Sequence, residues 1–274
     1  MTARWPQDWG RISAPFECSG VDVALPSAIT RRAQAHGSKD CMIDKKTVTV
    51  SIWPLAVSPG RLAALHAVLS RDEQDRVSKM KHEQAAREFV VSRGRAREVL
   101  ASACGCASTD IVLANASRGK PHLVDPLSPL TINLSHSGGY CALAIGAVPA
   151  IGVDIEVLRD TVGEFAKNVF SEREALAYAA YPPAERMGVF FRAWVAKEAY
   201  LKATGHGLAG GLKSLEIDLT AAPDIRPLAI GGNADTLTAW QFHGFDVTDT
   251  IAGAVAISTG GRPVDIRIDH IGVE

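Results

Sequence analysis

Long hydrophobic runs are absent from this sequence, and so is an excess of charge of either sign. No stretch reaches the roughly 20 apolar residues that span a membrane, and no N-terminal apolar run resembles a signal peptide. The formal net charge is −1, so no overall basic field attracts nucleic acid or anionic lipid. We expect a cytoplasmic protein, which we take to be a monomer, with no nucleic-acid or membrane partner.

Several common site motifs are also absent. The segment GLAGGLKS lacks the adjacent Gly-Lys of a Walker loop, no G-x-G-x-x-G follows a predicted strand, and neither G-x-S-x-G nor H-x-x-x-H occurs. The five cysteines are an odd number, and Cys104 and Cys106 form a C-x-C pair without a second ligand pair nearby. We therefore expect reduced thiols and no zinc site.

The composition is that of an ordinary globular protein. Of the 274 residues, 47% are hydrophobic and 22% are charged, which is enough for a sizeable core. Residues 1–46 show no clear period, and we interpret them as an N-terminal extension of unknown role. Beyond them the hydrophobic periods predict a strand at 47–55, charged helices over 59–103, strands within 131–146 and 149–158, helices over much of 161–204, and short strands over 213–274.

An internal similarity indicates two copies of one unit. When the sequence is aligned with itself so that Ser70 matches Ser171, LSRDE matches FSERE and Phe89 matches Phe190. At the same offset, TVTVSIWPL falls near AIGVDIEVL. One offset that serves three segments in order favours duplication. We predict an α+β fold with a pseudo-twofold pair of lobes, 47–148 and 149–274. Each lobe would be a small, mostly antiparallel sheet packed with helices, with a ligand cleft between the lobes.

Three acids occur in segments that otherwise predict burial. In IGVDIEVL, Asp154 and Glu156 share one face of the strand and hydrophobic side chains share the other. In FFRAWVAKEAYLKA, Glu198 lies within the apolar stripe of a helix, and Lys202 follows one turn later. A buried carboxylate costs several kcal/mol unless it is paired, so these positions need an explanation.

The aligned positions of the N-terminal copy carry none of these acids. The correspondence is Asp154 to Trp53, Glu156 to Leu55 and Glu198 to Arg97. Three carboxylates on one lobe repel each other unless a cation lies among them, and oxygen-only ligands suit Mg²⁺, with Mn²⁺ as an alternative. Two structural alternatives stay open. The D-x-E acids can form a solvated face, and Glu198 can form a rim ion pair with Lys202.

A second group of residues is suited to phosphate. RGKP places Lys120 on a turn whose backbone Pro121 fixes. NLSHSGG places Ser135 and His136 at a strand end, where a hydroxyl and an imidazole can donate to phosphate oxygens. A structural interpretation is also open, with Lys120 as a turn lysine and His136 as a satisfied histidine.

Together these motifs resemble those of the 4′-phosphopantetheinyl transferases of the Sfp type. That family has V/I-G-V/I-D-x-E followed by W-x-x-K-E-x-x-x-K, behind a G-K-P turn and an S-H-S segment. This sequence has GKP, NLSHSGG, IGVDIE and WVAKEAYLK in that order. The resemblance covers about 47–210 and departs from the pattern at Val195, where the family commonly has a smaller residue.

The resemblance implies transfer of the 4′-phosphopantetheine arm of coenzyme A to a serine of an apo acyl or peptidyl carrier protein, with release of 3′,5′-ADP. It implies that Asp154, Glu156 and Glu198 hold Mg²⁺. It also implies that Glu198 accepts the serine proton and that Lys202 binds the α-phosphate and protonates the leaving group. Glu174 matches a recurring acid that is either catalytic or a helix N-terminal residue. The implied contacts to coenzyme A are Arg87, Arg93, Lys120, Pro121, Ser135, His136 and Lys202.

Two alternatives remain. The same acids and lysine would serve another Mg²⁺-dependent enzyme that processes pyrophosphates, and a relative without catalysis could still bind carrier proteins. The order of the motifs argues against the first, and the intact acids argue against the second. The carrier can belong to fatty-acid, polyketide, nonribosomal peptide or siderophore biosynthesis.

Overall fold

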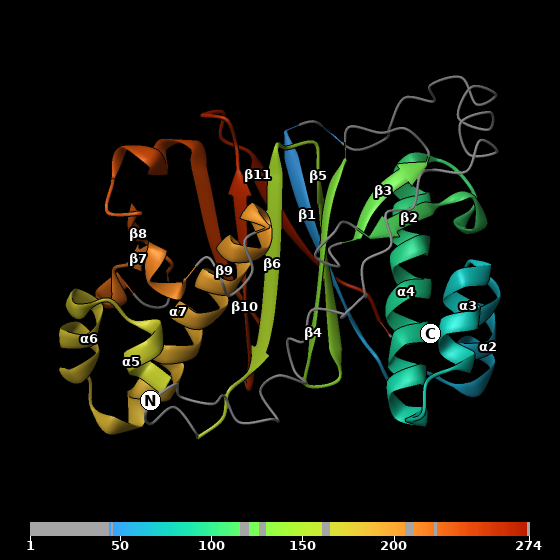
Figure 1. Cartoon of the computed structure of the whole chain (residues 1–274), viewed down its shortest axis with the longest axis horizontal. Coiled ribbons are helices and arrows are strands. Elements are labelled where there is room, and N and C mark those ends of the chain that lie inside the picture. Colours follow the sequence, from blue (N-terminus) through green and yellow to red (C-terminus); the bar gives the residue numbers. More distant parts are fainter. Residues whose placement is uncertain are drawn as a thin grey trace. The chain divides into compact units, whose positions relative to one another are not determined.

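The chain divides into two compact units, whose helices and strands are labelled in Figure 1. The computed structural model describes residues 44, 46–115, 121–125, 130–160, 165–205, 211–221 and 224–272. The first unit groups Trp53–Leu130 with His270–Glu274, and the second groups Lys45–Ile52 with Thr131–Asp269. The predicted N-terminal extension, 1–46, lies outside the described residues except for Asp44 and Lys46.

The first unit is mainly helical. Its elements are α2 (Pro59–Ala67), α3 (Arg71–Ser78), α4 (Glu83–Cys104), the 3-10 turn η1 (Ser108–Asp110), β2 (Val112–Asn115) and β3 (Pro121–Asp125). The helical pattern predicted over 59–103 is divided among three helices, because Ser58 and Ser70 cap α2 and α3 with their side chains and start each helix anew. Strands β2 and β3 form an antiparallel pair.

The second unit contains two larger sheets, with strand orders β11-β1-β5-β4 and β6-β10-β9, and a small β7–β8 pair. Its strands are β1 (Thr47–Pro54), β4 (Thr131–Ser137), β5 (Tyr140–Gly146), β6 (Ala150–Val157), β7 (Leu215–Ile217), β8 (Pro227–Ile230), β9 (Trp240–Thr248), β10 (Ile251–Ser258) and β11 (Asp265–His270). The pairs β4–β5, β6–β10, β9–β10 and β7–β8 are antiparallel. Hydrophobic side chains from both larger sheets meet in one core cluster that includes Val50, Val153 and Val255.

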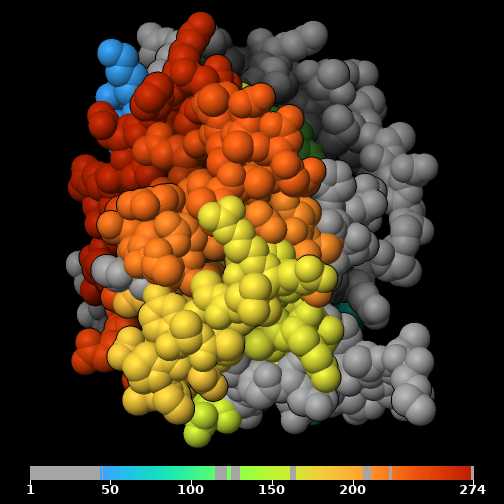
Figure 2. Space-filling view, turned by 90° about the vertical axis from the view of Figure 1, so that its left-hand side faces the viewer, coloured from blue at the N-terminus to red at the C-terminus, as the bar shows by residue number. Residues whose placement is uncertain are grey.

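One long helix covers the β6–β10 part of this unit. The helices are α5 (Ala166–Val169), α6 (Glu172–Ala179) and α7 (Pro183–Thr204), with 3-10 turns at η4 (Leu212–Ser214), η5 (Leu219–Ala221) and η6 (Asp235–Ala239). Helix α7 packs on β6 and β10. Gly152 permits this close approach, since a Cβ there would overlap the backbone of Ala199 and Ala203. Figure 2 shows the side of the unit where the yellow and orange atoms of α5, α6 and β7–β8 form the surface.

The predicted α+β class, with helices and small antiparallel sheets, is confirmed. The element order also repeats, since β1-α2-α3-α4-η1-β2-β3-β4-β5 is followed by β6-α5-α6-α7-η4-β7-β8-β9-β10, where the second copy has the additional 3-10 turns η5 and η6 on either side of β8. No helix in the described part of the chain is long and apolar enough to cross a membrane.

The predicted alignment of the two long helices is wrong by one residue. Helices α4 and α7 both have 22 residues, and both end at a left-handed glycine, Gly105 and Gly205. These ends place Arg97 opposite Lys197, so the counterpart of Glu198 is Glu98 rather than Arg97. At this position the first unit therefore does carry an acid.

Candidate active site

Two acids lie on strand β6, at the edge of its sheet. Asp154 and Glu156 alternate with Val153 and Ile155, which belong to the core, and so emerge on the opposite face, toward α7. Asp154 is 3% exposed and Glu156 is 7% exposed. The alternative of a solvated acidic face is therefore wrong, because helix α7 covers both side chains.

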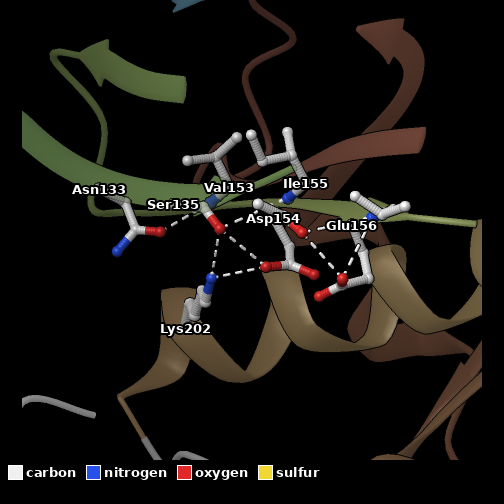
Figure 3. A network of polar contacts seen from close by, with 9 residues as sticks. Asn133, Ser135, Val153, Asp154, Ile155, Glu156 and Lys202 are labelled. Carbon is white, nitrogen blue, oxygen red and sulfur yellow. Dashed lines mark hydrogen bonds and ion pairs between the residues drawn. The ribbon is translucent and has the colours of Figure 1, made fainter. Parts of the chain in front are cut away.

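Polar side chains of β4 bind this edge of β6 (Figure 3). The bonds run from Val153 N to Asn133 Oδ1 at 2.8 Å, from Ile155 N to Ser135 Oγ at 3.4 Å, and from Val157 N to Ser137 Oγ at 3.3 Å. Asn133, Ser135 and Ser137, here called the β4 polar row, follow the two-residue period of the strand. Their side-chain oxygens accept hydrogen bonds from backbone N–H groups of β6, which would otherwise bind the carbonyl oxygens of a neighbouring strand.

Two members of the β4 polar row also reach the acids. Ser135 Oγ donates to Asp154 Oδ1 at 2.9 Å, and Ser137 Oγ donates to Glu156 Oε1 at 2.8 Å. Each serine hydroxyl thus accepts a hydrogen bond from a backbone N–H of β6 and donates its single proton to a carboxylate of β6. The row therefore fixes the strand and the acids together.

Helix α7 adds a cation and a third acid. Lys202 Nζ lies 2.6 Å from Asp154 Oδ1 and 2.9 Å from Ser135 Oγ (Figure 3). Glu198, one turn earlier, is 5% exposed, and among the described residues its Oε1 has no hydrogen-bond partner. The alternative of a rim ion pair between Glu198 and Lys202 does not fit, because Lys202 pairs with Asp154 and Glu198 is buried.

The three carboxylates carry more negative charge than Lys202 balances. Burial, followed by repulsion from Asp154, raises the pKa of Glu198 to about 7, against the lowering effect of Lys202. Burial and Asp154 also raise the pKa of Glu156, although the hydrogen bonds from Ser137 and the Val157 N–H and the charge of Arg159 oppose this. The site therefore favours an additional cation or proton near Glu198.

The donor chemistry of the site fits a hard divalent ion. All three acids supply oxygen, which Mg²⁺ and Mn²⁺ prefer, and the orphaned Oε1 of Glu198 is a buried acceptor that a cation would satisfy. Within the described ranges, however, no three acidic, histidine or cysteine side chains form an assembled ligand cluster. Asp154 Oδ1 is instead held by Lys202 and Ser135.

The predicted coenzyme A contacts fall in different parts of the chain. Ser135 belongs to the site, and His136, the next residue of β4, is exposed on the opposite face of the strand. Arg87 and Arg93 lie on α4 of the first unit, where Arg93 is buried and its guanidinium lies 5.8 Å from the ring centre of Phe89. Pro121 begins β3, and Lys120 lies outside the described residues. Their binding roles stay predictions.

Glu174 proves to be a structural acid. It forms a capping box with Ser171 at the start of α6, and its Oε1 accepts the N–H of Ile217 on β7. It also pairs with Lys197 Nζ at 2.9 Å, and Lys197 donates to the carbonyls of Leu212 and Leu215 as well. Exposure is 1% for Glu174 and 0% for Lys197, so this pair fixes α6, α7 and β7 without reaching solvent.

Sequence reasoning missed two members of the β4 polar row, Asn133 and Ser137, although both lie in the quoted segment NLSHSGG. The available signal was their period, since residues 133, 135 and 137 share one strand face just as Asp154 and Glu156 do. The sequence could not show that the two strands lie edge to edge, because β4 and β6 belong to different sheets.

Comparisons with known proteins find two matching family models and several similar proteins. A family model described as the 4′-phosphopantetheinyl transferase superfamily matches residues 150–258, and one described as 4′-phosphopantetheinyl transferase, N-terminal, matches residues 56–147. The chain is 34% identical over 218 residues to 4′-phosphopantetheinyl transferase HetI from Nostoc sp., which is 77% of this chain and 89% of that protein. It is 28% identical over 151 residues to 4′-phosphopantetheinyl transferase Sfp from Bacillus subtilis, which is 55% of this chain and 66% of that protein.

The two family models and the two compact units divide the chain at different places. The models meet between residues 147 and 150, near the predicted lobe boundary at 148. The compact units separate between Leu130 and Thr131, because β5 pairs with β1, β4 pairs with β5, and β4 contacts β6. The division into lobes at 148 stays a prediction.

Proposed function

Because the chain belongs to the 4′-phosphopantetheinyl transferase superfamily, we propose that it transfers the 4′-phosphopantetheine arm of coenzyme A to a serine of an apo acyl or peptidyl carrier protein. The serine oxygen forms a bond to the β-phosphorus of coenzyme A. The bond from that phosphorus to the bridging oxygen breaks, and 3′,5′-ADP leaves. The serine proton passes to a base, and the charge on the leaving phosphate requires a cation beside it.

Glu198 is the residue that we assign to accept the serine proton, directly or through a water molecule. Its Oε1 is buried without a partner in the described part of the chain, so a lone pair is available there. Lys202 is the residue that we assign to the α-phosphate. Its side chain is 24% exposed and held by Asp154 and Ser135, so its ammonium group can reach a ligand while remaining oriented. From there it can donate a proton to the leaving oxygen.

Asp154, Glu156 and Glu198 are the residues that would hold Mg²⁺, with Mn²⁺ as an alternative. When bound, the ion would neutralise negative charge on the pyrophosphate. The hydrogen bonds to Asp154 end on Oδ1 and those to Glu156 end on Oε1, so the bonds described leave one oxygen of each acid for a ligand. Lys202 would then be shared between Asp154 and the substrate.

The observation that carries this proposal is the buried, unpartnered carboxylate of Glu198 beside Asp154 and Lys202. The test is to incubate the purified chain with an apo carrier protein, coenzyme A and Mg²⁺, and to measure the mass of the intact carrier. We expect a gain of one phosphopantetheine group and release of 3′,5′-ADP. Release of nucleotide or phosphate without a mass gain would favour another pyrophosphate enzyme, and carrier binding without either product would favour a non-catalytic relative.

The coenzyme A contacts predicted from the resemblance can be tested separately. Lys120→Ala should raise KM for coenzyme A more than it lowers kcat, because a residue that binds ground state and transition state alike affects mainly KM. Dephospho-coenzyme A, which lacks the 3′-phosphate, would show whether His136, Arg87 or Arg93 binds that group. If His136→Ala discriminates between the two substrates as the wild type does, His136 does not contact the 3′-phosphate.

We also infer that the enzyme acts as a monomer in the cytoplasm on an apo acyl or peptidyl carrier protein. Loading rates measured across acyl and peptidyl carriers would rank the candidate partners by kcat/KM. Light scattering during size-exclusion chromatography would test the monomeric state.

A further inference from the structure

Ser137 binds strand β6 twice, once at a backbone N–H and once at the carboxylate of Glu156. The Ser137 hydroxyl already accepts the Val157 N–H at 3.3 Å, as Asn133 accepts the Val153 N–H at 2.8 Å. Asn133 completes its rung without touching an acid, whereas Ser137 uses its proton on Glu156 Oε1 at 2.8 Å. The β4 polar row thus contains one residue that only joins the strands, Asn133, and two serines that also bind a carboxylate.

The carboxylate of Glu156 is held on one side. Its Oε1 receives bonds from Ser137 Oγ at 2.8 Å and from the Val157 N–H at 3.1 Å, and Arg159 lies 3.5 Å away. Across the described residues, every hydrogen bond given to Glu156 ends on this oxygen. Two hydrogen-bond donors and the nearby charge of Arg159 on one oxygen fix the orientation of the carboxylate plane, and Oε2 is left as the oxygen with which it can bind a cation.

We propose that Ser137 is a positioning residue for the divalent-ion site: its hydroxyl orients Glu156 so that Oε2 can bind the ion. This inference rests on the proposed function, because that function assigns Glu156 as a metal ligand. Partners that orient a metal ligand commonly change metal affinity about 10–100-fold when they are removed. Ser137 would therefore act on the ion through Glu156, without touching the ion or the substrate.

A metal-binding measurement separates positioning from strand joining. Mn²⁺ is titrated into the full-length chain with saturating coenzyme A, and free Mn²⁺ is measured by its electron paramagnetic resonance signal, with coenzyme A alone as the blank. Ser137→Ala should raise the Kd for Mn²⁺ about tenfold or more. Ser137→Thr keeps the hydroxyl and should restore the Kd to within about threefold of wild type.

Asn133→Ala is the matched control, because it removes a rung of the same row and leaves both acids with their serines. It should lower the melting temperature and leave the Kd for Mn²⁺ within about twofold of wild type, since its bond ends on a backbone group. If Asn133→Ala does not fold, Thr131→Val takes its place. Thr131 is on the same strand and donates to the carbonyl of Val148 at 2.6 Å, away from the acids.

Each outcome has a definite consequence. An unchanged Kd in Ser137→Ala, or an equal rise in Ser137→Ala and the control, overturns the positioning role while the metal site stands. Absence of Mn²⁺ binding in the wild type, or equal binding in wild type and Asp154→Asn, overturns the metal assignment of the proposed function and this inference with it. A rise in Ser137→Ala alone, restored by threonine, supports the inference.

Discussion

Helices α4 and α7 are built alike and differ in the surroundings of one shared acid. Each has 22 residues, ends at a left-handed glycine and follows a shorter helix that starts with a capping box. Arg97 on α4 pairs with the capping-box acid Glu73, and Lys197 on α7 pairs with the capping-box acid Glu174. Both cations also donate to backbone carbonyls of the segment that follows the helix. The duplicated frame therefore keeps its buried ion pair in both units.

The next residue of each helix shows where the units diverge. Glu98 is 29% exposed and pairs with Arg61 and Arg95, so its charge is neutralised within the first unit. Glu198 is 5% exposed, and its Oε1 lacks a partner among the described residues. An identical residue at an equivalent position is structural in one unit and a candidate catalytic acid in the other. The difference lies in the surroundings, because two arginines pair with Glu98, whereas Asp154 and Glu156 repel the charge of Glu198 and Lys202 offsets them only in part.

The largest effect should come from removing the divalent ion, which only the second unit is proposed to bind. Excess chelator should reduce carrier loading by the wild type to background, and Mg²⁺ or Mn²⁺ should restore it. Asp154→Asn should lower kcat about 100–1,000-fold even at high Mg²⁺, because it removes a charged ligand and the partner of Lys202. Full loading in chelator would contradict the metal assignment, and loading rates over a Mg²⁺ titration provide the measurement.

The comparison is tested directly by changing the two equivalent glutamates. Glu198→Gln keeps the shape but loses charge and basicity, so kcat should fall about 100–10,000-fold, the usual contribution of a general base. Its melting temperature without ligand should hold or rise, because a neutral amide costs less to bury than an uncompensated carboxylate. Carrier loading and a melting curve on the same preparation measure both quantities.

Glu98→Gln is the control and should show the opposite pattern. Its kcat should stay within about twofold of wild type, while its stability should fall by about 1 kcal/mol as Arg61 and Arg95 lose their ionic partner. An active but destabilised Glu198→Gln would place Glu198 among the structural residues, beside Glu98.

The helix comparison also shows how far the sequence could be interpreted. The strand alternation predicts β6 with its two acids, and the helical stripe predicts α7 with Glu198, because each depends on local periodicity. The alignment of the helices is wrong because Phe89 and Phe190 match as residue types, whereas the shared contacts of Arg97 and Lys197 are long-range.

Serine rows are harder to foresee than helices. Ser135 and Ser137 can cap turns, line strands or face solvent, and nothing local distinguishes these roles. Their role here depends on β4 meeting the edge of β6, which is a property of the tertiary arrangement. Similarly, Lys202 was expected beside a phosphate, but the sequence did not show its pairing with Asp154.

The buried ion pairs provide a comparison of stability. Lys197→Met leaves the carboxylate of Glu174 at 1% exposure without its cation and should lower the free energy of unfolding by about 3–5 kcal/mol. Arg97→Met should have a smaller effect, because Glu73 is 14% exposed and water can solvate it. Urea unfolding measures both variants.

The control for these ion pairs is the double variant Lys197→Met with Glu174→Gln, which removes both charges. It should recover part of the stability that Lys197→Met loses, since two neutral groups cost less to bury than one unpaired charge. If the double variant is less stable than Lys197→Met alone, the loss comes from packing rather than from the stranded carboxylate.

The most gradual effect is the pH dependence that the unbalanced acids impose on the protein without metal. Burial and Asp154 raise the pKa of Glu198 from its ordinary value of 4.5 to about 7, although Lys202 opposes the shift, and the pKa of Glu156 is raised as well. Between these values the folded protein binds more protons than the unfolded chain, so the free energy of unfolding should decrease as pH rises. The contribution of Glu198 is complete below pH 4.5 and lost above about pH 7. It amounts to about 3 kcal/mol, or about 1.4 kcal/mol for each pH unit of the shift.

Urea unfolding at several pH values between 4.5 and 8, in excess chelator, measures this slope. Glu198→Gln should reduce the slope and Glu98→Gln should leave it unchanged, because only the first removes the group whose pKa is displaced. Saturating Mg²⁺ should also reduce the slope, because the ion favours the charged form of the carboxylates. A ligand that binds only the folded protein stabilises it most at pH values where the ligand site is deprotonated. An equal slope in wild type and Glu198→Gln would show that the negative charge around Glu198 is already balanced, as it is around Glu98 in the first unit.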